Sequence, residues 1–318
     1  MSGGRTALVV NALARTGEEQ FDRARAALER CGVALSAAHR VRDPAELRRR
    51  IRAELRRGAD RVIVGGGDGT IAAAAGVLGG TGAALGILPL GTANDFARAL
   101  GIPADLGRAC RVVAGGLTRA VDVGLAGGHA FLNAASVGAS SEVARRVKPA
   151  LKRRLGSLAY PLAGAAAAAT PPFRARLVAD GVVRHDGWAL QVLVGNGRFH
   201  GGGRLIAPGA RPDDGALDVY VLAAPPGAED GGGIARARGA LTLARYAALL
   251  LRGRHVEHPG LVHLRARRVA LRTEPPLEID ADGEVTGRTP AVFRLAAGAL
   301  EVIAPRRDRR RRLRGSER

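Results

Sequence analysis

A glycine-rich turn between two apolar segments is the feature that most constrains the fold of this chain. Arg61–Val64 predicts a short buried strand, the run GGGDG follows at residues 65–69, and Thr70–Leu78 predicts an alanine-rich helix. Glycines at such a junction let the backbone approach a ligand closely, and the N–H groups at a helix start form an anion site. The turn therefore predicts a phosphate cradle, although similar turns also occur without a ligand.

A second turn of the same kind follows the next predicted strand. Residues 89–98 have the sequence PLGTANDFAR and connect the strand Ala84–Leu88 to the helix Thr92–Leu100. Ligands of open α/β sheets bind beyond the carboxyl ends of the strands, so two such turns are expected at one crevice. Thr92 or Asn94 could serve only as a helix N-cap. A cap does not explain the polar pair Asn94-Asp95 between two apolar runs.

Strands and helices alternate through the first part of the chain, which predicts βαβ units and a parallel sheet with helices on both faces. The helix Pro44–Arg57 has the clearest start, with Asp43 as N-cap, proline at the first helical position and Glu46 completing a capping box. The remaining predicted elements before the first glycine turn are Thr6–Val10, Glu18–Cys31 and Val33–Ala38.

The pattern changes after the VDV run at residues 121–123 to β-rich segments separated by glycine turns, which predicts an antiparallel, sandwich-like domain. We therefore expect an α/β domain over residues 1–123, an all-β domain over 124–305 and a disordered basic tail over 306–318. Two helices, Ser157–Ala169 and Ile234–Leu251, and an exposed loop at Gly227–Gly233 are expected within the second domain. Its predicted strands are Ala130–Val137, Phe173–Asp180, Ala189–Gly195, Ala216–Leu222, Val269–Thr273 and Leu277–Asp280, with a hairpin turn at Asp180-Gly181.

The composition excludes several classes of protein. The 318 residues are 47% hydrophobic and carry 49 Lys+Arg against 29 Asp+Glu, a net charge of +20, which indicates a folded basic chain. No lysine follows a glycine, so a Walker P-loop is absent. Cys31 and Cys110 have no metal-binding or disulfide spacing. Aromatic residues, at 3%, are too sparse for a single-strand nucleic-acid platform. Without a signal peptide or a spanning apolar run, we expect a cytoplasmic protein.

Further motifs follow the two turns, and the whole series resembles the diacylglycerol kinase catalytic-domain family, in particular the bacterial lipid kinases. They are LGSLAY at 155–160, VGNGR at 194–198, GGG at 201–203, AP at 207–208, PDDGALD at 212–218 and DGE at 282–284. The motif GGDGT alone is shared with NAD kinases and phosphofructokinases, whereas the series in the family's order is specific. The resemblance covers nearly the whole chain except the tail and implies an NAD kinase-like, two-domain architecture.

The resemblance implies an ATP- and Mg²⁺-dependent lipid kinase that phosphorylates diacylglycerol to phosphatidic acid. Glu284 would accept the proton of the lipid hydroxyl. Mg²⁺ would bind the Asp214 carboxylate and the backbone carbonyls of Arg211 and Ala216, an all-oxygen set that suits this ion. Asp68, Asp95 and Asp122 would form an acidic network around the metal. The residues that would bind ATP are Gly66, Gly67, Asp68, Gly69, Thr70, Ile71, Ala72, Ala73 and Thr92.

The chain departs from the family pattern at two places that bear on ATP. Its first turn is NALA at residues 11–14, where the family has Asn-Pro, and Ala72-Ala73 replaces a common Asn-Glu pair. The changed first turn puts the phosphate contact of the family's amino-terminal turn in question. At Ala72-Ala73, backbone contacts to the nucleotide could persist, whereas a side-chain contact to the ribose or the metal network could not. Lower activity or a differently held nucleotide is therefore expected.

Two other functions remain open. The first is an NAD kinase-like enzyme, because GSLAY at 156–160 is similar to a motif of that family. The second is a catalytically silent relative that binds lipid or nucleic acid, although nucleic acid is disfavoured and the placed carboxylates argue against silence. A homodimer is expected by resemblance. Peripheral contact with an anionic membrane is expected through the arginine-rich tail and through Arg145, Arg146, Lys148, Lys152, Arg153 and Arg154. For the tail, an inert role is equally open.

Overall fold

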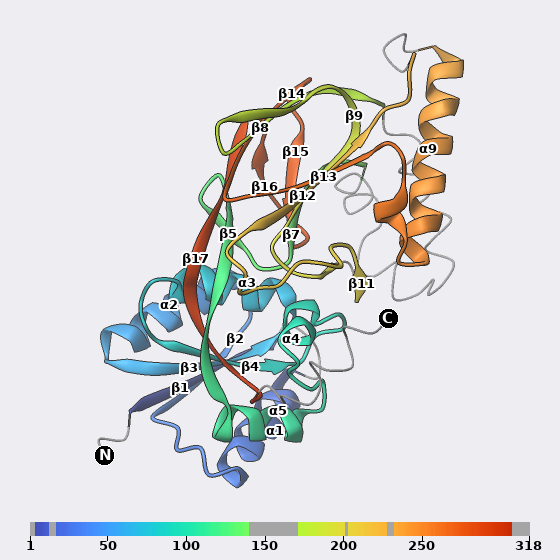
Figure 1. Cartoon of the computed structure of the whole chain (residues 1–318). Coiled ribbons are helices and arrows are strands. Elements are labelled where there is room, and N and C mark those ends of the chain that lie inside the picture. Colours follow the sequence, from blue (N-terminus) through green and yellow to red (C-terminus); the bar gives the residue numbers. More distant parts are fainter. Residues whose placement is uncertain (1–3, 13–16, 140–170, 201–202, 228–231, 307–318) are drawn as a thin grey trace. The chain divides into compact units, whose positions relative to one another are not determined.

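The computed structural model describes residues 4–12, 17–139, 171–200, 203–227 and 232–306. The chain forms two compact units: unit 1 contains Met1–Val121 and Leu300–Arg318, and unit 2 contains Asp122–Ala299 (Figure 1). The chain thus leaves unit 1 once and returns to it near its carboxyl end. The predicted helix Ser157–Ala169, the basic cluster at 145–154 and nearly all of the tail lie outside the described residues.

Unit 1 is built on a parallel sheet with the strand order β4-β3-β1-β2, and the end of β17 pairs with the outer side of β4. Helix α1 packs with α5 on one face, and α2 packs with α3 on the other (Figure 1). Because helices cover both faces, the inner strands β1, β3 and β4 each contain a run of buried apolar residues. The bounds are β1 Arg5–Asn11, α1 Gly17–Arg30, β2 Ala37–Val41, α2 Pro44–Arg56, β3 Ala59–Gly66, α3 Asp68–Leu78, β4 Ala84–Pro89, α4 Asp95–Ala99 and α5 Leu106–Gly115.

Three elements of unit 1 differ from the prediction. The strand expected at Val33–Ala38 lies at β2, because Gly32 (φ 76°) ends α1 and the Val33 N–H bonds back to the Leu28 carbonyl. The helix expected at Thr92–Leu100 is the shorter α4. Helix α5 was not predicted, although the Asp105 side chain caps it. The predicted start of α2 is confirmed, since the Asp43 carboxylate accepts the Glu46 N–H.

Unit 2 is an antiparallel β structure in which β7, β9, β8, β14 and β17 are neighbours in that order, and β15 and β16 extend it beyond β7. Strand β12 pairs with both β9 and β13. These pairings, together with the parallel sheet of unit 1, confirm the predicted fold class. The strands are β5 Leu117–Ala126, β6 His129–Phe131, β7 Ala134–Gly138, β8 Phe173–Ala179, β9 Val182–Gly195, β10 Phe199–His200, β11 Arg204–Leu205, β12 Leu217–Ala223, β13 Leu261–Ala266, β14 Arg268–Glu274, β15 Glu278–Ala281, β16 Glu284–Arg288 and β17 Ala291–Ala304.

Local sequence signals predicted a helix, a hairpin turn and about half of the strands of unit 2, and one predicted strand is split. Asp180 and Gly181 both have positive φ, 47° and 85°, and form the predicted hairpin turn. Helix α9 (Gly233–Leu251), followed by the short 3-10 helix η3 (His255–Glu257), confirms the helix predicted at Ile234–Leu251. The single strand predicted at Ala130–Val137 is split into β6 and β7. Strands β5, β10, β11, β13, β16 and β17 were not predicted.

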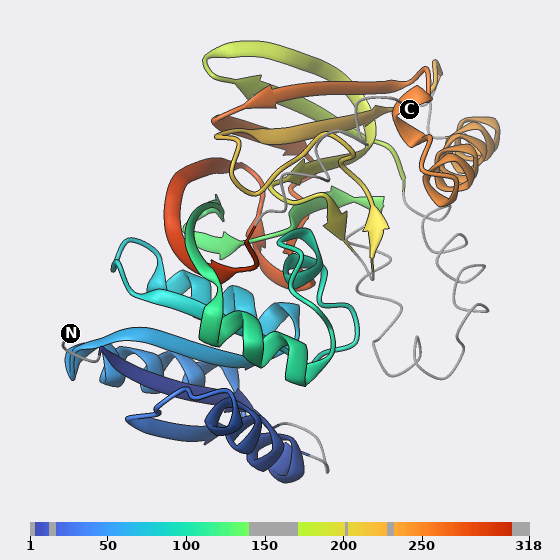
Figure 2. The same cartoon turned by 60° about the horizontal axis from the view of Figure 1, so that its bottom comes forward.

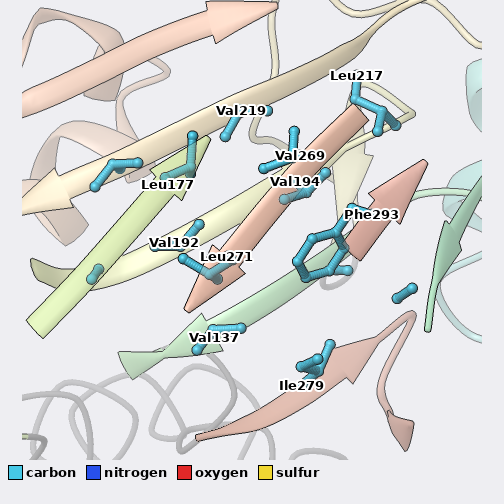
Figure 3. Close-up of a cluster of buried hydrophobic side chains, with 14 of the residues drawn as sticks. Val137, Leu177, Val192, Val194, Leu217, Val219, Val269, Leu271, Ile279 and Phe293 are labelled. Carbon is cyan, nitrogen blue, oxygen red and sulfur yellow. The ribbon is translucent and has the colours of Figure 1, made fainter. Parts of the chain in front are cut away.

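The core of unit 2 is formed by alternate residues of its strands, whose side chains meet between the strand layers (Figure 3). Each of these strands contributes between one and four of them, so no strand could bury its apolar face alone. Figure 2 shows these strands from a second direction, with α9 seen nearly along its axis at their margin. No helix within the described residues has the length and apolar character needed to cross a membrane. The core residues labelled in Figure 3 are Val137, Leu177, Val192, Val194, Leu217, Val219, Val269, Leu271, Ile279 and Phe293.

A buried carboxylate joins the elements of unit 1 outside the predicted site. Glu54 on α2 has no exposed side-chain surface and accepts hydrogen bonds from His39 (3.0 Å) and Arg57 (2.6 Å), with Arg5 at 3.6 Å. Burial alone would raise the pKa of Glu54, but the hydrogen bonds and charges of His39 and Arg57 outweigh it and hold the pKa below its ordinary value. The carboxylate therefore fastens α2 to β1 and β2.

Glu54→Gln is expected to lower the free energy of unfolding at neutral pH by about 1–3 kcal/mol, because a neutral amide replaces the buried carboxylate that accepts the Arg57 hydrogen bond and lies beside Arg5. A lowered folded-state pKa contributes stability above the ordinary value of 4.5, and that contribution is lost as pH falls through the folded pKa. Urea unfolding of parent and variant should thus converge in acid. A difference between them that is independent of pH would contradict this assignment.

Candidate active site

The first glycine turn places the start of α3 at the end of β3 in tight contact. A methyl group on Gly66 would lie 2.6 Å from the Thr70 side chain, so only glycine lets α3 fold back this closely. The Thr70 hydroxyl accepts a hydrogen bond from the Asn11 amide at the end of β1 (2.9 Å). The turns that follow β1 and β3 are therefore joined directly.

The second glycine turn packs against the first through backbone atoms. A methyl group on Gly91 would lie 2.4 Å from the Gly67 Cα, and the Leu90 N–H donates to the Gly66 carbonyl (3.0 Å). Asn94, in a left-handed conformation (φ 51°), accepts from the Gly91 N–H (3.1 Å) and donates to the Gly91 carbonyl (2.7 Å). The two motifs thus form one rigid structure at the carboxyl ends of β3 and β4.

Gly91→Ala is expected to destabilise unit 1 by about 1–3 kcal/mol, since the backbone of one turn must move to admit the methyl group. The same variant should weaken ATP binding, because the displaced neighbour is Gly67 at the start of α3. Gly115→Ala is the matched control: its methyl group meets no atom within 4 Å. Chemical denaturation and nucleotide titration would measure both effects. A Gly91→Ala protein as stable as the control would show that the turns do not touch.

Asp68 links the same two motifs electrostatically. Its Oδ1 accepts the Phe96 N–H (3.1 Å) at the start of α4, while the residue itself opens α3. The pKa of Asp68 is raised, mainly by burial and also by the negative charge of the buried Asp95. Hydrogen bonds from backbone N–H groups, that of Phe96 first, lower the pKa but do not outweigh these two effects. The structure therefore brings Asp68 and Asp95 of the predicted acidic network together and gives Asp68 a positioning contact.

The start of α3 offers backbone rather than side-chain groups to a ligand. Gly67 caps the helix without a side-chain hydrogen bond, so the first N–H groups of the helix remain available for an anion. The side chains of Thr70, Ile71 and Ala72 are buried, and Ala73 is half-buried. Thr92 is exposed in the second turn. Ala72 and Ala73 have no side-chain group that could bond a phosphate. Any phosphate contact at the start of α3 would therefore be made by main-chain N–H groups.

Asp122 holds the predicted metal turn in unit 2. One carboxylate oxygen accepts the Gly215 N–H (2.8 Å), the other accepts the Gly298 N–H (2.7 Å), and the Asp122 N–H donates to the Pro212 carbonyl (2.7 Å). Asn196 adds a second attachment, because its amide donates to the Asp122 carbonyl (3.0 Å). Asp122 therefore acts on the metal turn through the backbone, a role that its position in the sequence does not reveal.

Asp214 has the environment of a cation ligand. Burial raises the pKa of its carboxyl, Arg265 lowers it, and the negative charges of Asp218 and Asp122 raise it. Its Oδ2 lies 2.6 Å from an Arg265 nitrogen, and its Oδ1 accepts the Ala216 N–H (3.3 Å). A bound cation would stabilise the ionised Asp214 carboxylate beside these two other carboxylates, so Asp214 is a suitable oxygen ligand for the Mg²⁺ that the resemblance implies. The described residues hold no cluster of three metal-binding side chains, and the predicted set needs only one.

Asp218 and Arg265 belong to this site but were not among the predicted site residues. Asp218 is buried, its Oδ1 lies 2.8 Å from His263 Nε2, and Arg265 lies 4.0 Å from its Oδ2. Within the described part of the chain that Oδ2 accepts no hydrogen bond. The PDDGALD motif contained the signal for Asp218. Nothing in the sequence indicated Arg265, which comes from β13.

Asp282 anchors the turn that carries Glu284. Its carboxylate accepts the N–H groups of Leu132 (2.6 Å), Asn133 (3.0 Å) and Ala134 (3.1 Å), and its own N–H donates to the Ala134 carbonyl (3.0 Å). These bonds break the predicted strand Ala130–Val137 into β6 and β7. Glu284 follows as the first, exposed residue of β16. A fixed turn therefore presents an exposed carboxylate.

The predicted site residues are divided between the units. The predicted ATP-binding residues and Asp95 lie in unit 1, whereas Asp122, Glu284 and the metal turn lie in unit 2. Within unit 2, Asp122 and Asp214 are electrostatic neighbours. The GSLAY motif at 156–160 lies outside the described residues.

Comparison with known proteins identifies the family. Residues 5–126 match the diacylglycerol kinase catalytic domain, and residues 133–304 match the YegS C-terminal NAD kinase beta sandwich-like domain. A "Probable lipid kinase YegS-like" protein of Pseudomonas syringae pv. tomato is 35% identical over 82% of this chain and 81% of its own length. The chain belongs to the YegS-like lipid kinase family.

Two further relatives place this YegS-like chain among named kinases. A diacylglycerol kinase of Bacillus subtilis is 32% identical over 78% of each chain. The crystal structure of a diacylglycerol kinase from Bacillus anthracis superposes with a TM-score of 0.74 and 26% identity, covering 96% of this chain and 98% of that one. An NAD kinase from Archaeoglobus fulgidus, at 15% identity and a TM-score of 0.51, shares the fold. The predicted family and architecture are confirmed.

Proposed function

We propose that this member of the YegS-like family transfers the γ-phosphate of ATP to the hydroxyl of diacylglycerol, with Mg²⁺ as the divalent ion, and so forms phosphatidic acid and ADP. The observation that carries the proposal is the exposed Glu284 on a turn anchored by Asp282. Phosphoryl transfer depends mainly on positioning and charge stabilisation, and a carboxylate that orients the attacking hydroxyl must be held in place. The kinase named for diacylglycerol among the relatives supports the choice of acceptor.

Unit 1 would hold the nucleotide through its main chain. The free N–H groups at the start of α3 and the glycine backbone of residues 66–69 suit the negatively charged phosphates. Asp68 ties this turn to α4, so the cradle keeps its shape when the ligand leaves. Because residues 72 and 73 are alanines, the affinity for ATP depends on these backbone contacts and on Thr92.

Unit 2 would supply the metal turn and the base. The Asp214 carboxylate and the carbonyls of Arg211 and Ala216 would hold Mg²⁺, which neutralises charge on the phosphates when bound. Glu284 would take the proton of the acceptor hydroxyl. The hydroxyl oxygen would then bond to the γ-phosphorus while the bond from that phosphorus to the bridging oxygen breaks and ADP leaves.

A diacylglycerol acceptor resides in a bilayer, so we also propose peripheral action at the cytoplasmic face of the membrane. The basic residues that the sequence nominated for this contact, at 145–154 and in the tail, lie outside the described residues. A homodimer stays a prediction by resemblance, which analytical ultracentrifugation would test.

The acceptor is tested by transfer of labelled γ-phosphate from ATP and Mg²⁺ to a panel of compounds in mixed micelles. The panel contains diacylglycerol, phosphatidylglycerol, a sphingoid base and NAD. We expect phosphatidic acid as the main product, and a loss of at least about 100-fold in Asp214→Asn that added Mg²⁺ partly restores. Asp213→Asn is the matched control, since Asp213 pairs with Arg211 at the same turn. Transfer to NAD alone, or to another lipid alone, would overturn the diacylglycerol assignment.

A further inference from the structure

Helix α9 is the one long helix described in unit 2, and only one side of it is packed. Leu243 and Tyr246 enter a buried cluster with Leu190 and Leu222, and a methyl group on Gly239 would contact Leu190. The helix lies at the margin of the strands in both views (Figures 1 and 2). Most of the described residues on its opposite side are exposed.

The outward side of α9 is apolar where a solvent-facing helix is normally polar. Ile234 is 73% exposed, Leu241 is 72% exposed and Leu251 is 64% exposed. Ile234, Leu241 and Ala248 are spaced by seven residues, about two helical turns, so they form one line along the helix. Large apolar side chains in such a line indicate an interaction surface.

A parallel row of arginines lies beside this apolar line. Arg238, Arg245 and Arg252 are also spaced by seven residues and are all exposed. The sequence of α9 contains no acidic residue. Arg254, just beyond the helix, already pairs with Glu257 at 2.7 Å and is not counted in this row. The surface therefore combines exposed aliphatic groups with three arginines that form no ion pair with an acidic side chain among the described residues.

This combination selects among partners. Phosphates of nucleic acid would use the arginines but would leave the isoleucine and leucines in water. The surface of an anionic bilayer uses both, because the aliphatic groups enter the acyl boundary while arginines reach phosphate headgroups. We infer that α9 lies on anionic lipid bilayers, with Ile234, Leu241 and Leu251 inserted and Arg238, Arg245 and Arg252 at the headgroups. This site is separate from the residues of the proposed reaction and does not depend on the acceptor.

The test is binding of the full chain to vesicles of phosphatidylcholine with and without phosphatidylglycerol. Arg238→Gln/Arg245→Gln/Arg252→Gln should weaken binding to the anionic vesicles by about 100-fold. Ile234→Ser/Leu241→Ser/Leu251→Ser should weaken it by roughly tenfold or more. The three arginines replaced by lysine should keep most of the binding. Arg49→Gln/Arg52→Gln/Arg56→Gln, on the exposed side of α2, removes the same charge without exposed leucines and should have little effect.

Phosphoryl transfer in mixed micelles without anionic lipid separates this inference from the proposed function, since every α9 variant should retain parental rates there. Loss of vesicle binding with normal micelle activity supports the inference. Equal losses in the α9 and α2 arginine variants would overturn it in favour of net charge alone. Serine variants that bind anionic vesicles as tightly as the parent would also overturn it. That conclusion would hold whether or not the same variants break a dimer or bind duplex DNA.

Discussion

Glu284→Gln is expected to lower kcat for lipid phosphorylation by a factor on the order of 10²–10⁴, the usual contribution of a positioned acid or base. Glutamine keeps the size and the exposed position of the side chain at the start of β16 but cannot accept the proton. The affinity for ATP and the unfolding transition should stay near the parental values. Initial rates at saturating ATP and lipid measure the loss directly.

The matched control for this variant is Glu278→Gln on β15, the other strand of the same hairpin. It removes one carboxylate from the hairpin without touching the turn at Asp282, and kcat should change little. A Glu284→Gln enzyme that keeps its kcat and changes only KM for the lipid would show that Glu284 binds the acceptor without taking its proton.

Asp282→Ala is expected to lower the free energy of unfolding of unit 2 by about 3–5 kcal/mol. The variant leaves the N–H groups of Leu132, Asn133 and Ala134 without their acceptor in a partly buried place, and each such loss costs about 1–3 kcal/mol before relaxation. Urea unfolding followed by far-ultraviolet circular dichroism measures the change. Activity should fall as well, since Glu284 loses its fixed turn.

Asp186→Ala is the control for that experiment. Asp186 pairs with Arg174 (3.0 Å) and Arg176 (2.8 Å) on the surface of unit 2, and exposed pairs contribute only about 0–1 kcal/mol. If the two aspartate variants were equally stable, the three hydrogen bonds to Asp282 would not anchor the turn.

Asp282 also shows why some roles were hidden in the sequence. The run Asp282-Gly283-Glu284 indicated a turn and, by resemblance, a base. The three backbone partners of Asp282 lie about 150 residues earlier in the chain. The same holds for Asp122, whose partners at 212, 215 and 298 are brought to it by β12 and β17. Contacts at such separations depend on which strands become neighbours, and local patterns do not encode that choice.

The amino-acid sequence by itself determined the local conformations and the class of the fold. Glycine runs, a capping box at Asp43 and a hairpin turn at Asp180-Gly181 act over a few residues, where steric and hydrogen-bond preferences are strong. Only the tertiary structure decided that the two glycine turns touch and that Asp122 and Asp282 serve as anchors. These outcomes depend on burial and on backbone partners from distant segments, which exist only after the sheets have assembled.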